Sequence, residues 1–366
     1  MPASFSYRTA FFKRLRKNKG AVFGLVIIGL AFLLAILAYF IAPDNSPYAN
    51  RIIPEIANQK PGFTIYFLRI RKRENNTGFV DHLINGQPDR FEYVPITGYK
   101  ATKDSIIIEK YIDEGIIEKQ SYAVKEPVVD PASVQNAYNI IRQKFYLGTD
   151  KFGRDILSRL IIGVRISLGV GLIAVAISLS VGILLGALAG FYKGRVDDVI
   201  TWFINIIWSI PTLLLVFAIT IVLGKGFWQV FIAVGLTMWV NVARLVRGQV
   251  LAIRELEYID AARVMGFSNT RIITKHILPN ILGPVLVIAA SNFASAIVIE
   301  AGLSFLGVGV QPPQPSWGLM IKENYNFIIT NNPMLALAPG VAIMLLVLAF
   351  NLLGNGLRDA LNVRSK

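Results

Sequence analysis

The chain contains no cysteine, only two histidines and little charge. Without cysteine, disulfides, thiolate catalysis and cysteine-based zinc sites are excluded. One histidine, His82, stands alone and is predicted to be an ordinary surface residue. The sequence also lacks a G-x-x-x-x-G-K-[ST] phosphate loop, an H-E-x-x-H zinc motif and a G-x-S-x-G nucleophile motif. These absences predict a chain that is not an enzyme and does not hydrolyse nucleotides through a Walker site.

The low charge accompanies a high apolar content. Only 16% of the 366 residues are charged, 54% are hydrophobic, and the mean hydropathy is +0.53. A soluble domain of this length needs more charge to cover its surface. The apolar residues form runs close to the roughly 20 residues that a bilayer-spanning helix needs, so we predict a polytopic membrane protein. Its six predicted spans are residues 21–42, 167–190, 199–222, 228–246, 281–303 and 335–353.

Three of these spans have distinguishing features. The first follows basic residues, as a signal peptide does, but its 22 residues exceed the roughly 7–15 of a signal h-region, so we expect a permanent anchor. The third contains Pro211 and is expected to kink rather than break, because neighbouring helices can satisfy the freed backbone groups. The fifth holds Pro284, Asn292 and Glu300, is the least lipid-like, and is expected to face the protein interior.

Basic residues predict the orientation under the positive-inside rule. Residues 1–20 carry six lysines or arginines and no acid, which indicates a cytoplasmic N-terminal tail. Six spans return the C-terminus, with residues 356–366 as its tail, to the same side. The cytoplasmic segments then carry most of the net charge of +14. The basic balance therefore follows from topology, and nucleic acid is not an expected partner.

The segment after the first span, residues 43–147, has a different character. It contains the runs FTIYFLRIRK, RFEYVPI, SIIIEKYI and IIEKQSYAV, separated by Gly, Pro, Asn and Asp. Such apolar and β-branched runs are typical of short strands. We predict a β-rich extracytoplasmic subdomain that contacts a partner subunit or an external binding protein.

A polar island, residues 254–280, interrupts the apolar runs. Its first part has helical periodicity, with Tyr258, Ala261, Ala262 and Met265 expected on one face. Gly266 suits the left-handed position that ends a helix. Ser268 is placed to cap a second helix, carrying Ile272, Ile273, His276 and Ile277, that is expected to end at Pro279.

Three interpretations of the island remain open from the pattern alone. It is an interfacial loop lying on the membrane, a DNA-binding helix-turn-helix, or a docking element for a cytoplasmic partner. Tethering between two spans and three acids in the first helix disfavour DNA. A narrow face of small and apolar residues favours insertion into a partner's groove.

The motif D-A-A-x-x-x-G, residues 260–266, followed by H-I-L-P-N, residues 276–280, resembles the EAA loop of type I ATP-binding cassette importer permeases. Asp260 stands where that family usually has Glu. Residues 147–171, 186–200, 299–318 and 354–364 resemble the C-type permease of its dipeptide and oligopeptide branch, whose relatives also carry nickel or glutathione.

The resemblance implies an all-α membrane protein with the type I permease fold, whose core spans residues 163–355. It implies a second homologous permease, two cytoplasmic ATPase subunits and an extracytoplasmic solute-binding protein as partners, in a bacterial inner membrane. No cofactor is expected on this chain, because ATP and Mg²⁺ belong to the ATPase subunits. The coupling helix that contacts the ATPase is expected to use Glu257, Tyr258, Asp260, Ala261, Ala262, Met265 and Gly266.

Other polar residues allow two interpretations each. Asn292 and Ser295 line the translocation path or make interhelical hydrogen bonds. Glu300 binds a peptide's amino terminus or a structural partner. A further group forms a solute site or an ion-pair lattice that fixes the helix entering the second span, namely Asp150, Arg154, Asp155 and Arg159. A gradient-driven secondary transporter is the alternative class, for which Glu300 alone is a poor proton relay.

Overall fold

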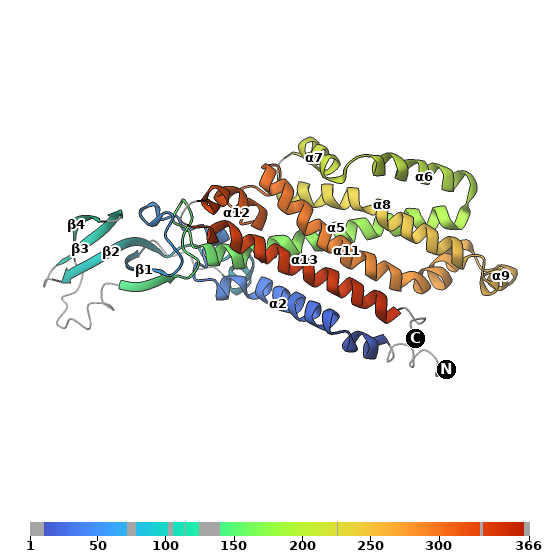
Figure 1. Cartoon of the computed structure of the whole chain (residues 1–366), viewed down its shortest axis with the longest axis horizontal. Coiled ribbons are helices and arrows are strands. Elements are labelled where there is room, and N and C mark those ends of the chain that lie inside the picture. The colour runs from blue at the N-terminus through green and yellow to red at the C-terminus, as the bar shows by residue number, and fades with distance from the viewer. Residues whose placement is uncertain are drawn as a thin grey trace. The chain divides into compact units, whose positions relative to one another are not determined.

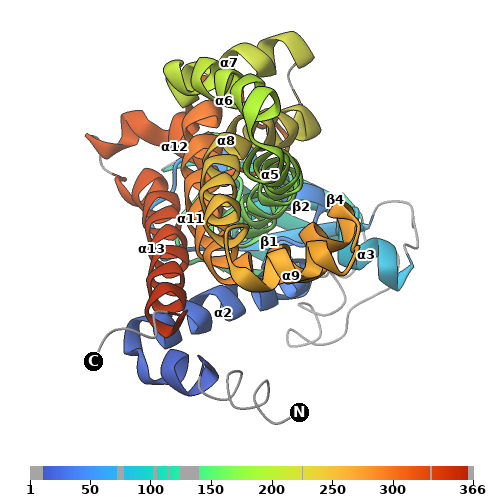
Figure 2. The same cartoon turned by 90° about the vertical axis from the view of Figure 1, so that its right-hand side faces the viewer.

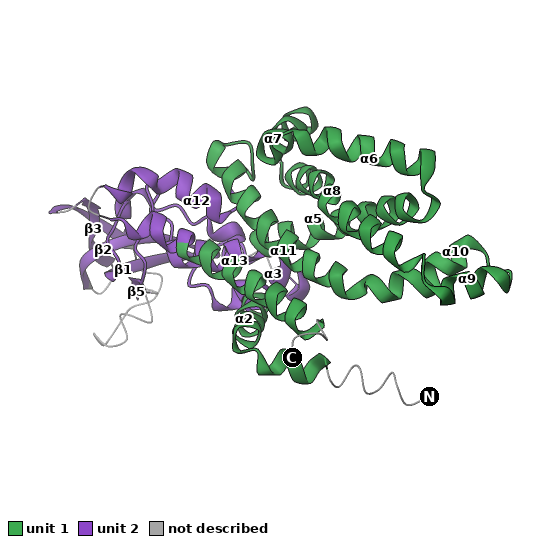
Figure 3. Ribbon diagram, turned by 45° about the vertical axis from the view of Figure 1, so that its right-hand side comes forward, with its two compact units in different colours: residues 1–33, 166–311, 341–366 green, residues 34–165, 312–340 purple. Residues whose placement is uncertain are grey.

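The computed structural model describes residues 11–71, 78–101, 105–113, 115–123, 140–224, 226–329 and 332–361. The chain divides into two compact units, coloured green and purple in Figure 3. Unit 1 comprises residues 1–33, 166–311 and 341–366 and is helical. Unit 2 comprises residues 34–165 and 312–340 and contains the β-sheet.

Within the described ranges, five helices are long and apolar enough to cross a membrane. They confirm five of the six predicted spans, and most extend beyond the predicted limits. Figure 1 shows these helices. The last one remains helical well past residue 355, into the predicted tail. The five are α2 (Lys19–Ile41), α5 (Ile156–Tyr192), α8 (Phe227–Ile253), α11 (Leu278–Leu306, continuous with the helical residues from Asn269) and α13 (Met334–Leu361).

The third predicted span consists of two helices. Helix α6 (Gly194–Ser209) and helix α7 (Thr212–Leu223) meet at an angle of 95°. Proline disfavours helical backbone in the residue before it, and Ile210 is extended with φ −92° and ψ 130°. Pro211 also lacks the N–H that would continue the hydrogen-bond ladder. The predicted kink is therefore wrong, because Pro211 lies at a break between two helices.

Helices α5 and α8 lie next to each other (Figure 2). They approach closely through three glycines that are spaced four residues apart on one face of α5, namely Gly182, Gly186 and Gly190. A Cβ atom on Gly186 would lie only 2.5 Å from the carbonyl oxygen of Ala243. The neighbouring two glycines would meet α8 at 2.5 and 2.8 Å. Small residues at such spacing let two membrane helices pack backbone to backbone.

We expect Gly186→Leu to force α5 and α8 apart. Overpacking of a close contact destabilises by about 1–3 kcal/mol, so the Tm of the purified protein should fall. Gly29→Leu is the matched control, since nothing lies within 4 Å of a Cβ at Gly29 on α2. Equal Tm values for the two variants would show that the glycine contact does not stabilise the protein.

Helix α8 is the most buried of the five candidate spans. In its most apolar 18-residue stretch 67% of residues are buried, against 44% for the helix containing α11. Helix α8 contacts α6, α7 and α11 as well as α5, so most of its circumference is covered. The fifth span was expected to face inward because of its polar residues, yet the span before it is the more interior one.

The insertion after α2 is a five-stranded antiparallel sheet in the order β4-β3-β2-β1-β5. The four predicted strands are confirmed, and a fifth, β5, was not predicted because charged residues alternate in its short run IIRQKF. Unit 2 also holds two short helices, α3 (Phe79–Asn85) and α12 (Trp317–Asn324). The strands are β1 (Phe63–Arg71), β2 (Phe91–Ala101), β3 (Ser105–Asp113), β4 (Ile116–Ala123) and β5 (Ile140–Phe145).

The side chains of β1 point alternately to the two faces of the sheet, and each face carries an apolar cluster. Ile65 and Phe67 pack with Ile53 and Ile56 from the segment that follows α2. Leu68, on the opposite face, packs with residues of β2, β3 and β5. Successive side chains of a strand point to opposite faces, so this β-rich run forms two hydrophobic clusters.

Candidate functional site

The polar island begins with helix α9 (Glu257–Val264) and a glycine turn. Gly266 has φ +75°, and its N–H donates to the carbonyl of Arg263 at 2.9 Å, which confirms the predicted left-handed helix end. Ser268 then caps the next helix by accepting a hydrogen bond from the N–H of Arg271. Both turn residues therefore act as the sequence predicted.

The second helix of the island does not end at Pro279, and that prediction is wrong. Residues 269–306 form one 38-residue helix, of which α11 is the larger part. Ile272–Ile277 is a π-helical segment, and only Leu278 separates it from the proline. In regular α geometry the proline ring would meet the carbonyl of Lys275, and the wider turn relieves that clash.

Helix α9 has an inward and an outward face. Ile259 and Ala262 are buried, in one apolar cluster with Ile272, Val250 and others. Ala262 is only 1% exposed, so the prediction that it shares a face with Tyr258, Ala261 and Met265 is wrong. At about 100° per residue, Ala262 lies at the edge of that face and turns toward its own core.

The outward face of α9 is exposed and partly apolar. Tyr258, Val264 and Met265 are 43%, 88% and 65% exposed. Ala261 and Gly266 are exposed between them, as are Glu257 and Asp260. Val264 was not predicted, although its position three residues after Ala261 is the signal that identifies it.

Polar contacts fix the island to the end of α5. Lys193 pairs with Glu255 at 2.7 Å, and this ammonium lowers the pKa of the Glu255 carboxyl. Arg254 donates to the carbonyl oxygen of Phe191. On the other side, the Asn280 amide donates to the Tyr258 hydroxyl at 3.2 Å. These contacts hold α9 in place, with its outward face exposed.

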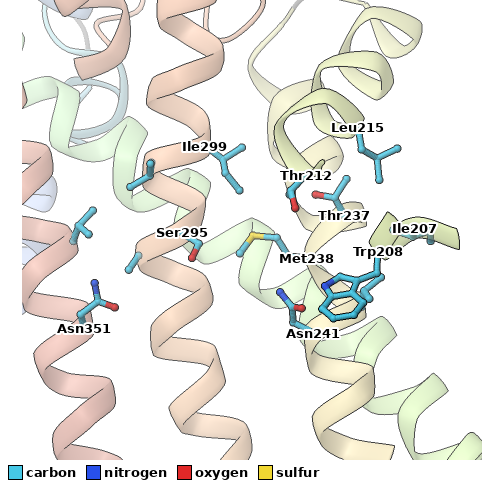
Figure 4. A pocket seen from close by; sticks show the side chains of 14 residues that line it. Ile207, Trp208, Thr212, Leu215, Thr237, Met238, Asn241, Ser295, Ile299 and Asn351 are labelled. Atoms are coloured by element: carbon cyan, nitrogen blue, oxygen red, sulfur yellow. The ribbon is translucent and has the colours of Figure 1, made fainter. Parts of the chain in front are cut away.

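A pocket of about 400 Å³ opens on unit 1 between α6, α7, α8, α11 and α13 (Figure 4). Of the predicted path residues, Ser295 lines it. The sequence reasoning missed the amides of Asn241 and Asn351, which also line it. Their signal was an isolated amide within an apolar run. None of the described residues that line the pocket is charged. Apart from the amides and hydroxyls, the lining side chains are apolar or aromatic, such as Met238 and Trp208.

Asn292 and Glu300 lie on other faces of α11. Asn292 is buried, and its amide lies 3.4 Å from the Ser178 hydroxyl on α5, as the interhelical interpretation predicts. Glu300 is fully buried and accepts a hydrogen bond from the Ser304 hydroxyl at 2.6 Å. That hydroxyl also accepts from the N–H of Val310. Neither side chain lines the pocket.

In unit 2, three of the four residues predicted to form an ion-pair lattice do so, with one additional acid, and the prediction for Asp155 is wrong. Arg154 contacts Asp150 at 2.6 Å and Glu323 of α12 at 3.0 Å. Arg159 lies 3.7 Å from the same Glu323. Asp155 is not part of the lattice; it accepts from the N–H of Ser158 at 3.0 Å at the start of α5, and burial raises the pKa of its carboxyl.

Comparison with known families matches two parts of the chain. Residues 182–366 match the family described as the binding-protein-dependent transport system inner membrane component. Residues 6–61 match the N-terminal TM domain of oligopeptide transport permease C. The first match contains the pocket-lining helices α8, α11 and α13 and all of α9.

Curated relatives extend this similarity. The dipeptide transport system permease protein DppC of Alkalihalophilus pseudofirmus is 38% identical over 77% of this chain and 95% of its own length. The glutathione transport system permease protein GsiD of Pectobacterium atrosepticum is 42% identical over 60% of this chain and 73% of its own. The oligopeptide transport system permease protein OppC of Bacillus subtilis is 40% identical over 59% and 71%.

Among solved structures, the inward-facing MetNI methionine ABC transporter covers 56% of this chain and 97% of its own, with 19% identity and a TM-score of 0.47. The family model covers half of the chain, and the DppC relative is covered almost completely. The family match, residues 182–366, includes helix α9 and the apolar spans α8 and α11 that flank it. The chain belongs to the family of binding-protein-dependent transport system inner membrane components, as a multi-pass permease of a bacterial ABC importer.

Proposed function

We propose that this chain is the C-type permease of an ATP-driven importer of di- and oligopeptides. With a second homologous permease it forms the translocation path, and a solute-binding protein delivers the peptide on the outer side. Two ATPase subunits bind ATP and Mg²⁺ in the cytoplasm. Peptide specificity is supported by relatives named for dipeptide and oligopeptide transport.

The outward face of α9 is the observation that carries the proposal. A short helix braced on both sides, with Val264 and Met265 exposed, is suited to fill a groove on another protein. In this role Tyr258, Ala261, Val264 and Met265 contact the ATPase. Ala262 supports the helix from behind. The island and both termini are then cytoplasmic, in agreement with the basic N-terminal tail.

The pocket supports a path shared with a second permease. Asn241, Ser295 and Asn351 are exposed, although each lies within a span. Polar groups at such positions face protein or a water-filled cavity rather than lipid. Neutral amides and hydroxyls can exchange hydrogen bonds with peptide groups of any sequence, which suits a path that carries many peptides.

A deletion strain tests this function. Loss of the chain should abolish uptake of labelled dipeptides and oligopeptides, and a plasmid copy should restore it. A pull-down of the tagged chain should recover a subunit with a Walker motif. The GsiD relative makes glutathione the second candidate. Lost glutathione uptake with unchanged peptide uptake would replace the peptide assignment.

We expect Glu300→Gln to lower transport of free and N-acetylated peptides by the same factor. Glu300 is buried against Ser304 and does not line the pocket, so its role is structural. Uptake of the two peptide forms into vesicles measures the ratio. Ser304→Ala, which removes the same hydrogen bond, is the matched variant. A selective loss for the free peptide would instead make Glu300 a ligand of the amino terminus.

A further inference from the structure

Helix α3, in the insertion after α2, exposes large apolar side chains. Phe79, Val80 and Ile84 are 72%, 65% and 59% exposed. Three such side chains on a seven-residue helix form a concentrated apolar patch. Contiguous exposed patches of this kind mark surfaces that contact a partner or a membrane.

The position of α3 relative to α2 is fixed by one arginine. The Arg165 guanidinium donates to the carbonyl oxygens of Leu83 and Ile84, at 2.5 and 2.9 Å. It also donates to the carbonyl of Ala35 in α2, at 2.5 Å. Next to these contacts, a Cβ on Gly86 would lie 2.7 Å from the Tyr39 ring, so the chain after α3 runs tightly along α2. The apolar patch is therefore held at one place on unit 2.

The patch continues the lipid-facing surface of α2. The Phe40 ring of α2 lies 5.8 Å from the Phe79 ring and 4.7 Å from the His82 ring. Phe40 is 47% exposed, and Ile36, one turn earlier on α2, is 56% exposed. Helix α2 is a candidate membrane span with few buried residues, so its exposed apolar side chains are suited to contact with lipid. The same lipid boundary thus reaches α3.

The backbone and the polar side of α3 also suit a membrane boundary. The last carbonyls of a helix lack partners within it, and in a lipid environment they need partners from the protein. The Arg165 guanidinium is the hydrogen-bond partner of two of these carbonyls. Asp81 and Asn85 are exposed on a different side of α3 and are hydrogen-bonded to each other at 2.7 Å. The helix therefore has one apolar and one polar exposed side.

We propose that α3 lies in the interfacial layer of the bilayer beside the end of α2, with Phe79, Val80 and Ile84 inserted among the lipid chains. Short amphipathic helices adopt this position with their apolar face at the boundary between headgroups and chains. With a cytoplasmic N-terminus, this is the outer leaflet. The insertion then anchors the sheet of unit 2 at the membrane surface, a role additional to transport.

The absence of cysteine from this chain makes the test direct. Val80→Cys and Asp81→Cys, each carrying a nitroxide label, are compared in the assembled transporter in phosphatidylethanolamine–phosphatidylglycerol vesicles. Both positions are exposed, so neither label disturbs packing. Wild-type transporter treated with the same label gives the background from other subunits.

Power-saturation spectroscopy then measures collisions with oxygen, which is enriched in lipid, and with a water-soluble nickel chelate. At position 80 oxygen collisions should exceed nickel collisions, and at position 81 the order should be reversed. Nickel collisions as frequent at position 80 as at 81 would place α3 in water and overturn the proposal. Low collision rates with both reagents at position 80 would mean that another subunit covers α3, which also overturns it.

Discussion

Ala261→Trp is expected to abolish peptide transport while the protein still assembles in the membrane. Ala261 is exposed on the outward face of α9, so an indole there displaces no residue of this chain. In the proposed role it faces a close-fitting groove on the ATPase, where the added volume prevents seating. The defect should therefore appear in coupling and not in folding.

The expected size follows from the energy that the gate needs. Moving a two-state gate from 1:99 to 99:1 takes roughly 5.5 kcal/mol of differential binding. If poor seating removes about half of this, roughly 2.7 kcal/mol, coupling falls about a hundredfold, since each 1.4 kcal/mol is tenfold. Peptide-stimulated ATPase activity and uptake, measured on the same reconstituted sample, should fall together.

Three variants separate a lost contact from general damage. Ala261→Ser keeps a small side chain and should retain transport. Asn269→Trp adds the same ring at another exposed position of the island and should be tolerated. Ala262→Trp inserts it into the apolar cluster beneath α9 and should reduce the folded yield. Full coupling in Ala261→Trp, or an equal loss in Asn269→Trp, would disprove the assignment of this face.

Arg154→Ala is expected to destabilise unit 2 by about 3–5 kcal/mol, the usual effect of removing one partner from a buried ion pair. The Arg154 side chain is 4% exposed and contacts both Asp150 and Glu323. Its removal leaves two carboxylates near each other without their main cation. Arg159 is more distant from both acids, at 4.0 and 3.7 Å, and cannot replace it without moving.

Thermal unfolding of the purified transporter measures this effect as a lower Tm. The control is Lys110→Met, which removes the ion pair between Lys110 and Glu55 in the same unit, at 3.0 Å, whose two side chains are 23% and 26% exposed. Pairs that water reaches add little stability because water screens them and the side chains lose entropy, so the control should leave the Tm unchanged. Equal Tm values for Arg154→Ala and wild type would show that the lattice does not hold unit 2 together.

The apolar runs predicted the spans well because length and composition suffice for that inference. A run of about 20 apolar residues has few alternatives to a membrane helix. The apolar and β-branched runs after α2 likewise predicted four strands, and Gly266 and Ser268 predicted a helix end and a helix start. These features depend on neighbouring residues in the chain, whose conformational preferences are local.

The sequence by itself therefore determined the membrane class, the approximate spans and the turn chemistry of the polar island. Only the tertiary structure decided that Pro211 breaks its helix and Pro279 does not, because packing decides whether a chain with a missing N–H bends or continues. It also turned Ala262 inward, brought Glu323 to Arg154 and collected Asn241, Ser295 and Asn351 around one pocket. Each of these depends on which helices meet, and periodicity along one segment carries no information about its neighbours in space.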